Sequence, residues 1–539
     1  MKNQLRLGIT LLVTLLIVVC CEPPKKKIEY PKTDLSQNSL IPKPLKVIPT
    51  NSAFGLDSKT AIYTNQVFDG FEEVGNYLAE KLKSRLNLDI PVNELDGESI
   101  ERLIFINQSD SLEMTSDEAY ELYIKNDSVL LNAKTAAGAF RGIQTLRQLI
   151  PEQSNDTLAE QPMWLIPSGK IIDEPNFEYR GAMLDVARHF FTVEEVKRFI
   201  DLLAYYKYNK FHMHLTDDQG WRIEIMSWPK LTEIGGQSEV GGGEGGFYTQ
   251  EEFKDLVAYA AERHIEIIPE VDMPGHTNAA NLSYPIFHAG GKADKPRVRT
   301  DMLVGYSSFA ARKDTVYAFL DDVVREISAI SPSQYFHIGG DESHVTSKAD
   351  YIHFVEKVEK IVRKHGKRAV GWNEIAQANL DSSTVGQFWN EPESALETVK
   401  KGGQIIMSPA TKAYLDMQYD SLSEHGLHWA AYIEVDEGYN WDPETFVEGL
   451  PKENILGIEA PLWSETISNS TEMDYLAFPR AIGYAELGWT NSEDRDWEEY
   501  KERLADQQPF LDRNDVNYYP SQKVPWKKKK EIYKKISKD

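Results

Sequence analysis

Short apolar segments and amphipathic helical segments alternate along the chain from Tyr179 to about Trp489. The short segments are rich in β-branched and aromatic residues, which is typical of buried strands. This alternation is the pattern of βα units that build a parallel sheet. Eight repeats over roughly 310 residues predict an α/β fold, a (β/α)8 or TIM barrel with insertions in its loops. The expected strands are 181–186, 210–215, 266–271, 335–338, 368–372, 384–388, 405–408 and 456–460.

A smaller block with a different pattern precedes the barrel. Strands are expected at 60–64, 102–107 and 128–132, and amphipathic helices at 74–87 and 136–150, which indicates an α+β domain. This block has no convergent acids or histidines, so we interpret it as a non-catalytic support. The expected units after the linker are an N-terminal domain (38–175), the barrel (176–495) and a C-terminal helical tail (496–539).

The first 21 residues have the composition of a targeting segment. Lys2 and Arg6 precede the apolar run 7–19, which is too short to span a bilayer comfortably. We therefore expect residues 1–21 to be a signal peptide, and residues 22–37 to be a polar, proline-bearing linker. A membrane-retained N-terminal helix and a plain secretory signal are the alternatives.

The two cysteines of the chain, Cys20 and Cys21, lie where this apolar run ends. The arrangement resembles a bacterial lipoprotein signal, in which a cysteine becomes the lipidated first residue of the mature protein. Val19 is bulkier than the small residue usual before that cysteine, so we expect lipidation of Cys21, with Cys20 as the alternative. The protein would then be exported and lipid-anchored to the bacterial cell envelope, in the periplasm or at the outer membrane.

The formal net charge of −25 narrows the choice of partners. Neither nucleic acid nor an anionic membrane surface attracts such a chain, so we expect no nucleic acid and membrane contact by the lipid anchor only. A neutral glycan is not repelled. The basic stretch 526–539 is a local exception, which we interpret as a solvated helix face or a frayed tail. The sequence leaves the oligomeric state open.

The segment YFHIGGDE, residues 335–342, brings two adjacent carboxylates to the end of one expected strand. Neighbouring side chains on a regular strand point to opposite faces, so Asp341 and Glu342 can serve one pocket only if the backbone turns. Gly339 and Gly340 permit that turn. The arrangement predicts a catalytic dyad, and the alternative is a helix N-cap.

Polar and aromatic residues recur at the other strand ends as well. A barrel has its chemistry at the C-terminal ends of its strands, so this recurrence indicates one shared site. The residues at these positions are Asp185, Arg188, Asp217, Asp218, Glu270, Asp272, His276, Asp341, Glu342, Trp372, Trp389, Trp463 and Glu465.

Eight sequence runs resemble glycoside hydrolase family 20, the β-N-acetylhexosaminidases, in their order and spacing. The resemblance covers residues 38 to 495 and is closest to the bacterial exo-acting members. It implies release of terminal nonreducing β-linked GlcNAc or GalNAc from glycans, with retention of configuration and without a cofactor. The runs are RGAMLDVARHFF, HMHLTDDQGWRIEI, PEVDMPGHTNAA, HIGGDE, GWNE, AYLDMQY, HGLHWA and EAPLWSET.

The resemblance also implies a role for each matching residue. Glu342 would be the acid and then the base, while the substrate's own acetamido oxygen attacks C1 and Asp341 holds the acetamido N–H. Adjacent carboxylates fit this assistance, because an ordinary retaining pair flanks the sugar at about 5–5.5 Å. Asp217 and His276 would support Glu342, and we expect neighbours that raise its pKa.

The remaining matches imply a pocket for one sugar. Trp372, Trp389 and Trp463 would wall the acetamido group, and barrel core is the alternative for each tryptophan. For Arg188 the alternative is a surface salt bridge. The implied substrate contacts are Tyr414 at the acetamido oxygen, Arg188 and Glu465 at the sugar hydroxyls, Asp416 at a sugar hydroxyl or at the leaving group, and Trp429 on the leaving-group side.

Two further interpretations remain beside an exo-acting enzyme: a disaccharide-releasing member of the family, and a glycan-binding surface lipoprotein without catalysis. A zinc site built on His212, His214 and His276 is not expected, because residues i and i+2 of a strand both point into the barrel. We therefore expect no metal. Asn373 departs from the family, in which many members have an acid at this position.

Overall fold

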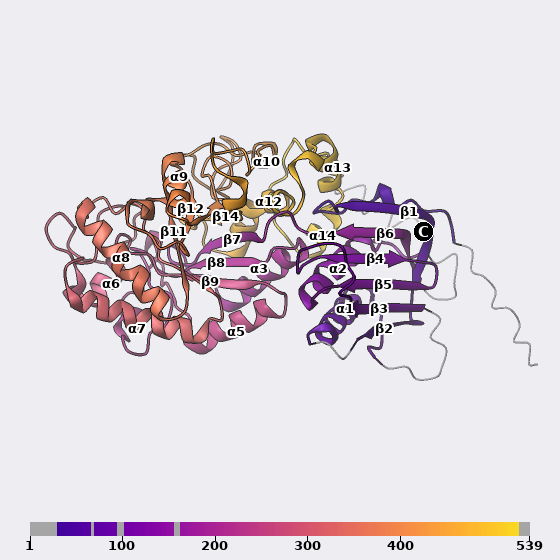
Figure 1. Cartoon of the computed structure of the whole chain (residues 1–539), viewed down its shortest axis with the longest axis horizontal. Coiled ribbons are helices and arrows are strands. Elements are labelled where there is room, and N and C mark those ends of the chain that lie inside the picture. The colour runs from indigo at the N-terminus through magenta and orange to yellow at the C-terminus, as the bar shows by residue number, and fades with distance from the viewer. Residues whose placement is uncertain (1–29, 66–68, 94–101, 156–161, 528–539) are drawn as a thin grey trace, which may run out of the picture.

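The computed structural model describes residues 30–65, 69–93, 102–155 and 162–527. A closed eight-stranded barrel and a smaller α+β domain lie side by side along the long axis of the molecule (Figure 1). The TIM barrel and the smaller domain before it confirm the predicted fold class. The expected signal peptide, with Cys20 and Cys21, and the tail from residue 528 onward lie outside the described residues.

All eight barrel strands run parallel, in the closed order β7-β8-β9-β10-β11-β12-β13-β14. Their bounds differ from the expected ones by no more than two residues, which is the ordinary uncertainty of strand ends. The strands are β7 (Tyr179–Asp185), β8 (Lys210–His214), β9 (Glu266–Glu270), β10 (Tyr335–His337), β11 (Arg368–Trp372), β12 (Val385–Phe388), β13 (Gln404–Met407) and β14 (Ile455–Leu462).

Helices cover the outside of the barrel, and several begin at strong sequence signals. Thr192 and Thr249 form capping boxes with Glu195 and Glu252, which fixes the start of α3 and α5. No α-helix separates β11 from β12, which are joined through the 3₁₀ segment η4.

The longer helices are α3 (Val193–Tyr205), α5 (Gln250–Ala261), α7 (Asp314–Ile330), α8 (Lys348–Lys364), α9 (Pro392–Lys400), α11 (Ser470–Ala477) and α12 (Arg480–Trp489). The short ones are α4 (Lys230–Glu233), α6 (Asn278–Ser283), α10 (Val435–Tyr439), η2 (Val240–Gly242), η3 (Pro285–Phe287), η4 (Asn373–Gln377), η5 (Lys452–Asn454) and η6 (Ser492–Asp494).

The barrel interior is filled in layers of side chains, as is usual for this fold. One layer is apolar and aromatic, and consists of Tyr179, Ile268, Tyr335, Val370, Val385, Ile406 and Leu456. A second layer, nearer the C-terminal ends of the strands, is polar although its members are fully buried. It consists of His212, Glu270, His337, Gln387 and Glu459.

The small domain is a six-stranded mixed sheet in the order β1-β6-β4-β5-β3-β2, with two helices packed on it. Both helices lie on the side of the sheet that faces the barrel (Figure 1). The elements are η1 (Leu35–Gln37), β1 (Lys46–Leu56), β2 (Thr60–Thr64), α1 (Phe71–Leu86), β3 (Arg102–Gln108), β4 (Tyr120–Ile124), β5 (Ser128–Ala133), α2 (Ala136–Leu149) and β6 (Trp164–Asp173).

The small domain binds the barrel at the N-terminal ends of its strands. Arg180, near the start of β7, and Arg141 on α2 both donate to Glu118 Oε2 at 2.6 Å. Lys207, just before β8, donates to Asp173 Oδ2 at 2.9 Å. The C-terminal ends of the strands therefore lie at the opposite end of the barrel from the small domain.

The described part of the C-terminal tail also packs at this junction. It contains α13 (Trp497–Ala505) and α14 (Gln508–Arg513). Arg503 binds both carboxylate oxygens of Glu486 at 2.7 Å, and Phe510 stacks on Tyr205 with ring centroids 3.7 Å apart. No helix among the described residues has both the length and the apolarity needed to cross a bilayer.

The junction leads to a stability prediction. Although burial alone would raise it, Arg180 and Arg141 hold the pKa of Glu118 well below its usual value. Replacing Glu118 with Gln leaves two buried guanidinium groups without their carboxylate, so the free energy of unfolding should fall by about 3 kcal/mol at neutral pH. We expect urea unfolding to show this loss at about pH 7 and a smaller loss at about pH 4, because the stabilisation from a depressed carboxyl pKa is complete above the unfolded pKa and is lost as the pH falls from there through the folded pKa. Glu251→Gln, at an exposed site on α5, is the control, and equal losses in both variants would contradict the prediction.

Candidate active site

The backbone turns sharply after β10 and brings the two adjacent acids to one side. Gly339, Gly340 and Glu342 have φ angles of 63°, 108° and 45°, all in the left-handed region. A Cβ at Gly339 would lie 1.8 Å from Asp272 Oδ1, so this position requires glycine. The next helix, α8, begins at Lys348 behind its own cap, Ser347. Asp341 and Glu342 therefore do not cap a helix.

A cavity of about 210 Å³ opens between the C-terminal ends of the barrel strands. Every residue that the sequence analysis assigned to catalysis or to substrate contact lines it. These residues are Arg188, Asp341, Glu342, Trp372, Trp389, Tyr414, Asp416, Trp429, Trp463 and Glu465.

Aromatic rings form most of the cavity wall. Trp372 is buried, and its ring centroid lies 5.6 Å from that of Trp463, which in turn lies 6.3 Å from Tyr414. Trp429 is 57% exposed and lies 6.0 Å from both Trp389 and Tyr414. The buried rings thus enclose the bottom of the cavity, while Trp429 forms part of its rim.

Two apolar residues of the wall had no signal in the sequence, and a third lies inside a quoted run without having been singled out. Met302 and Val304 belong to the long irregular segment between η3 and α7, and Leu427 lies in the loop after β13, within the run HGLHWA. Met302 is 48% exposed and Val304 is 39% exposed. No motif or periodicity marks Met302 and Val304, because a loop reaches the cavity only through the path of the folded backbone.

Arg188 binds two acids and lies against an aromatic ring. Its NH1 and NH2 groups are 3.2 Å from Asp185 Oδ2 and 3.0 Å from Asp217 Oδ2. Its guanidinium carbon is 5.0 Å from the centroid of Trp463. Arg188 is therefore ion-paired, but in a buried position that lines the cavity and not on the surface.

Burial raises the pKa of two further acids that line the cavity, Asp416 and Glu465. The pKa of Asp416 lies well above its usual value, and the Glu465 carboxylate acts in the same direction as burial. For Glu465, Arg188 opposes the effect of burial on the pKa. A protonated Asp416 carboxyl group can donate as well as accept hydrogen bonds, which suits recognition of sugar hydroxyls.

His276 lies between the adjacent acids and Asp217. Its Nδ1 is 3.1 Å from Asp217 Oδ1, and its Nε2 is 3.6 Å from both Asp341 Oδ2 and Glu342 Oε2. Although burial would lower it, Asp217 and Asp341 raise the pKa of His276 well above its usual value. The ring is therefore a buried cation that contacts all three carboxylates.

This cation reverses one expectation from the sequence. Burial would raise the pKa of Glu342, but the hydrogen bond and charge of His276 lower it below its usual value. The prediction that neighbours raise this pKa is wrong for the ligand-free site. Burial instead raises the pKa of Asp341, with the Glu342 charge acting in the same direction and His276 opposing it.

Glu374 is a buried acid of this region that the sequence analysis quoted only within the run GWNE. Burial, together with the charge of Asp341, raises the pKa of Glu374 to about 8. Its Oε2 accepts the indole N–H of Trp389 at 3.1 Å. The preceding Asn373 accepts the backbone N–H groups of Trp389 and Asn390 at 3.1 and 3.2 Å. The residue that departs from the family thus fixes the loop after β12.

A buried chain of hydrogen bonds links His276 to the barrel interior. Asp217 Oδ2 lies 3.0 Å from His214 Nε2, and His214 Nδ1 lies 2.6 Å from Glu270 Oε2. The second oxygen of Glu270 accepts the indole N–H of Trp372 at 3.1 Å. One carboxylate therefore positions both a wall of the cavity and, through His214 and Asp217, the histidine beside the acids.

Several of these groups lie close enough to share a metal ion. The candidate ligand atoms within each group are within 4.8 Å of one another, but carboxylates already hydrogen-bond to the ring nitrogens of His214 and His276. The expectation that no metal is needed stays a prediction. The groups are His212, Glu270 and His337; His214, Glu270 and Asp272; Asp217, Asp218 and His276; and Asp272, His276 and Asp341.

Comparisons with known proteins agree with this site. Residues 177–492 match the catalytic domain of glycosyl hydrolase family 20, and residues 37–174 match domain 2 of that family. A β-N-acetylhexosaminidase of Cellulomonas fimi is 39% identical over 413 residues, covering 76% of this chain and 82% of that protein. The GH20 β-N-acetylhexosaminidase structure from Streptomyces coelicolor is 42% identical with a TM-score of 0.85, covering 91% of this chain and 99% of that one. An exo-β-N-acetylglucosaminidase of Vibrio harveyi, solved in complex with N-acetylglucosamine, is 33% identical with a TM-score of 0.80, covering 94% of this chain and 81% of that one. The chain therefore belongs to glycosyl hydrolase family 20 and is a β-N-acetylhexosaminidase.

Proposed function

We propose that the protein removes single terminal nonreducing β-linked GlcNAc or GalNAc residues from glycans by a retaining, substrate-assisted mechanism. The observation that carries this proposal is the pair Asp341 and Glu342 beside an aromatic pocket, with no second carboxylate pair needed across the sugar. Family 20 belongs to the glycosidases in which the substrate itself supplies the nucleophile.

The first step is attack by the acetamido oxygen on C1 of the bound sugar. Glu342 protonates the leaving oxygen, so the glycosidic bond breaks as the oxazolinium ring closes. Asp341 accepts the acetamido N–H and balances the charge that develops on the ring nitrogen. Tyr414 donates its hydroxyl to the acetamido oxygen, and the buried faces of Trp372 and Trp463 hold the group under the ring.

In the second step Glu342 regains its proton. Glu342, now a carboxylate, removes a proton from water, which attacks C1 from the side the leaving group occupied and regenerates the acetamido group. The His276 cation stabilises the Glu342 carboxylate formed in the first step, because its Nε2 faces that group at 3.6 Å. The same contact lowers the pKa of Glu342. The protonated fraction of Glu342 in the free enzyme, and with it the rate of hydrolysis, therefore declines as the pH rises above the acid range.

The size and closure of the cavity favour exo action on one sugar. At about 210 Å³ it is smaller than the roughly 300–1,000 Å³ clefts that hold drug-sized ligands. Arg188, Asp416 and Glu465 contact the hydroxyls of the terminal residue. A disaccharide-releasing enzyme would need room beyond these groups, and a non-catalytic glycan-binding protein would not need an acid beside Asp341.

The mechanism predicts a dependence on the acetamido group. We expect hydrolysis of the p-nitrophenyl β-glycosides of GlcNAc and GalNAc but not of glucose, which lacks the internal nucleophile. Glu342→Gln should lower kcat/KM on poorly activated alkyl glycosides by about 10²- to 10⁴-fold, because proton donation is lost. Steady-state kinetics measures both effects, and proton NMR of the first anomer released should show the β product. Hydrolysis of the glucoside at a comparable rate, or release of the α anomer first, would contradict the mechanism.

A second prediction tests the positioning role of Glu270. Glu270→Gln weakens the hydrogen bonds to both Trp372 and His214. We therefore expect kcat to fall by roughly 10²-fold and KM for the N-acetyl sugar to rise. Glu459→Gln is the matched control, because Glu459 is equally buried in the barrel but binds Tyr179, His212 and Gln387. Equal losses of kcat in the two variants would show that a general loss of barrel packing is responsible.

We further propose that the protein is exported and held at the bacterial cell envelope by a lipid on Cys21. The support is the N-terminal sequence: two early basic residues, an apolar run of moderate length, and the cysteines at its end. A lipid anchor places the enzyme where extracellular glycans can reach it without a membrane-spanning segment.

The anchor can be tested by fractionation of cells that express the full chain. We expect the parent and Cys20→Ala in the membrane fraction, carrying radiolabel from fatty acid, and Cys21→Ala without label. If Cys20→Ala loses the label and Cys21→Ala keeps it, the lipid is attached to Cys20. Absence of label from all three proteins would overturn the proposed anchor.

A further inference from the structure

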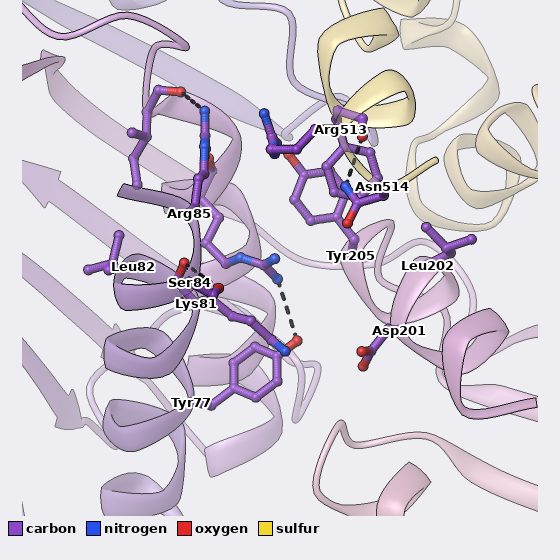
Figure 2. Close-up of a pocket in the computed structure, with 13 residues that line it drawn as sticks. Tyr77, Lys81, Leu82, Ser84, Arg85, Asp201, Leu202, Tyr205, Arg513 and Asn514 are labelled. Atoms are coloured by element: carbon purple, nitrogen blue, oxygen red, sulfur yellow. Dashed lines mark hydrogen bonds between the residues drawn. The ribbon is translucent and has the colours of Figure 1, made fainter. Parts of the chain in front are cut away.

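A second enclosed space lies far from the active site, where the small domain meets the barrel. Its volume is about 300 Å³. Figure 2 shows the side chains of α1, α3 and α14 that converge on it, among them Arg85, Tyr205 and Arg513. We call this space the junction pocket, and its lining residues are Tyr77, Lys81, Leu82, Ser84, Arg85, Arg147, Ile150, Asp201, Leu202, Tyr205, Phe510, Arg513 and Asn514.

The junction pocket is basic in a strongly acidic protein. The chain has a formal charge of −25, yet four cations and a single carboxylate line the pocket. That carboxylate, Asp201, already binds Arg263 and accepts the hydroxyl of Tyr259 at 3.0 Å. The cations in the pocket are therefore not neutralised by an acid that lines it.

Two of the four cations share one acid outside the pocket. Arg85 NH2 lies 2.9 Å from Glu152 Oε1, and Arg513 NH1 binds the other oxygen of Glu152. Arg85 also donates to the backbone oxygens of Arg147 and Ile150 at 3.0 and 2.9 Å, which fixes its guanidinium group. Burial lowers the pKa of Arg85, and the positive charges of Arg513 and Arg147 lower it further, although Glu152 opposes this. The guanidinium groups thus repel one another across the pocket.

Arg147 has no such acid. Its guanidinium carbon lies 5.0 Å from the ring centroid of Tyr205 and 5.7 Å from that of Tyr77. It donates to Gln144 Oε1 and, at 3.5 Å, to the Tyr77 hydroxyl. Within the part of the chain that the structure describes, no carboxylate lies within ion-pair distance of Arg147. Its two aromatic neighbours hold the guanidinium group in place without neutralising its charge.

We propose that the junction pocket binds a tetrahedral oxyanion, either a free phosphate or sulfate ion or the same group carried on a small sugar. Planar guanidinium groups from three helices, an ammonium group and tyrosine hydroxyls are the donors that phosphate and sulfate oxygens require. A volume of about 300 Å³ also accommodates a ring attached to the anion, and the stacked rings of Tyr205 and Phe510 offer it an apolar face.

The occupied site would join the two domains. Arg85 and Arg147 belong to the small domain, Tyr205 to the barrel helix α3, and Arg513 to the C-terminal helix α14. An anion bound to residues of all three parts binds only when they are assembled. Binding therefore stabilises the docked arrangement by mass action, without a direct contact at the active site.

The test is thermal unfolding and titration calorimetry of the enzyme with sodium phosphate, sodium sulfate and N-acetylglucosamine 6-phosphate. Sodium chloride at equal ionic strength controls for charge screening, and Arg147→Gln controls for the general stabilisation that phosphate and sulfate confer by exclusion from the protein surface. We expect phosphate or sulfate to raise the melting temperature of the parent more than that of Arg147→Gln. We also expect Arg147→Gln to weaken the measured binding by at least about tenfold, while kcat and KM stay unchanged. Binding of the sugar phosphate alone, if Arg147→Gln weakens it, would support the same site and identify the sugar-borne group as its source.

Two further variants keep the result interpretable. Lys81→Gln removes a cation whose one ion pair with another described residue, at 3.2 Å, is with the adjacent Glu80, so the variant should fold normally and also bind the anion more weakly. Arg312→Gln removes an exposed guanidinium group that binds Asp350 and lines neither cavity, so it should bind as the parent does. The proposal is overturned if none of the three anions binds, or if Arg147→Gln and Lys81→Gln bind them as tightly as the parent.

Discussion

The structure depends on one constraint: acids that are buried next to one another must be neutralised. Asp185, Asp217, Asp272 and Asp341 are all buried at one end of one barrel, where water screens them poorly, and Glu342 lies beside them. The chain meets this constraint in two ways. Some carboxylates face buried cations, as Asp217 faces Arg188 and His276. Others, such as Asp272 and Asp416, favour the protonated state because burial raises the pKa of each.

This balance sets the chemistry of the site. The His276 cation is held by Asp217, which His214 and Glu270 hold in turn, so the charge beside Glu342 is fixed by residues that never touch the substrate. Glu270 also binds the indole of Trp372. The aromatic pocket and Glu342 thus depend on the same carboxylate, so a displacement of Glu270 would shift both.

The same constraint governs the junction of the domains at the opposite end of the barrel. Glu118 and Asp173 are each buried or nearly so, and each binds a cation of the barrel, Arg180 and Lys207 respectively. These pairs give the docking of the small domain a defined geometry. The junction pocket differs, because the cations in its lining outnumber the acids, although Arg85 and Arg513 share Glu152 outside it.

The sequence by itself determined the barrel, the smaller domain and most of the residues that line the catalytic cavity. Strand periodicity and turn glycines act locally, so strands such as 368–372 can be located from their own residues. The runs around Arg188, Asp341 and Trp463 identify positions, because each occupies the C-terminal end of a strand and a barrel brings all such ends together. The sheet of the small domain was predicted less fully, since β1 and β6 lie far apart in the sequence and pair only in the folded chain.

The tertiary structure alone decided the charge of each group and the paths of the loops. The lowered pKa of Glu342 depends on the His276 ring, which lies 66 positions earlier in the sequence yet 3.6 Å away in space. Met302 and Val304 reach the cavity through a loop that has no periodicity, and Arg147 meets Arg513 only because two domains dock. Burial and distance between remote residues fix these properties, and neither quantity is encoded at any single position of the chain.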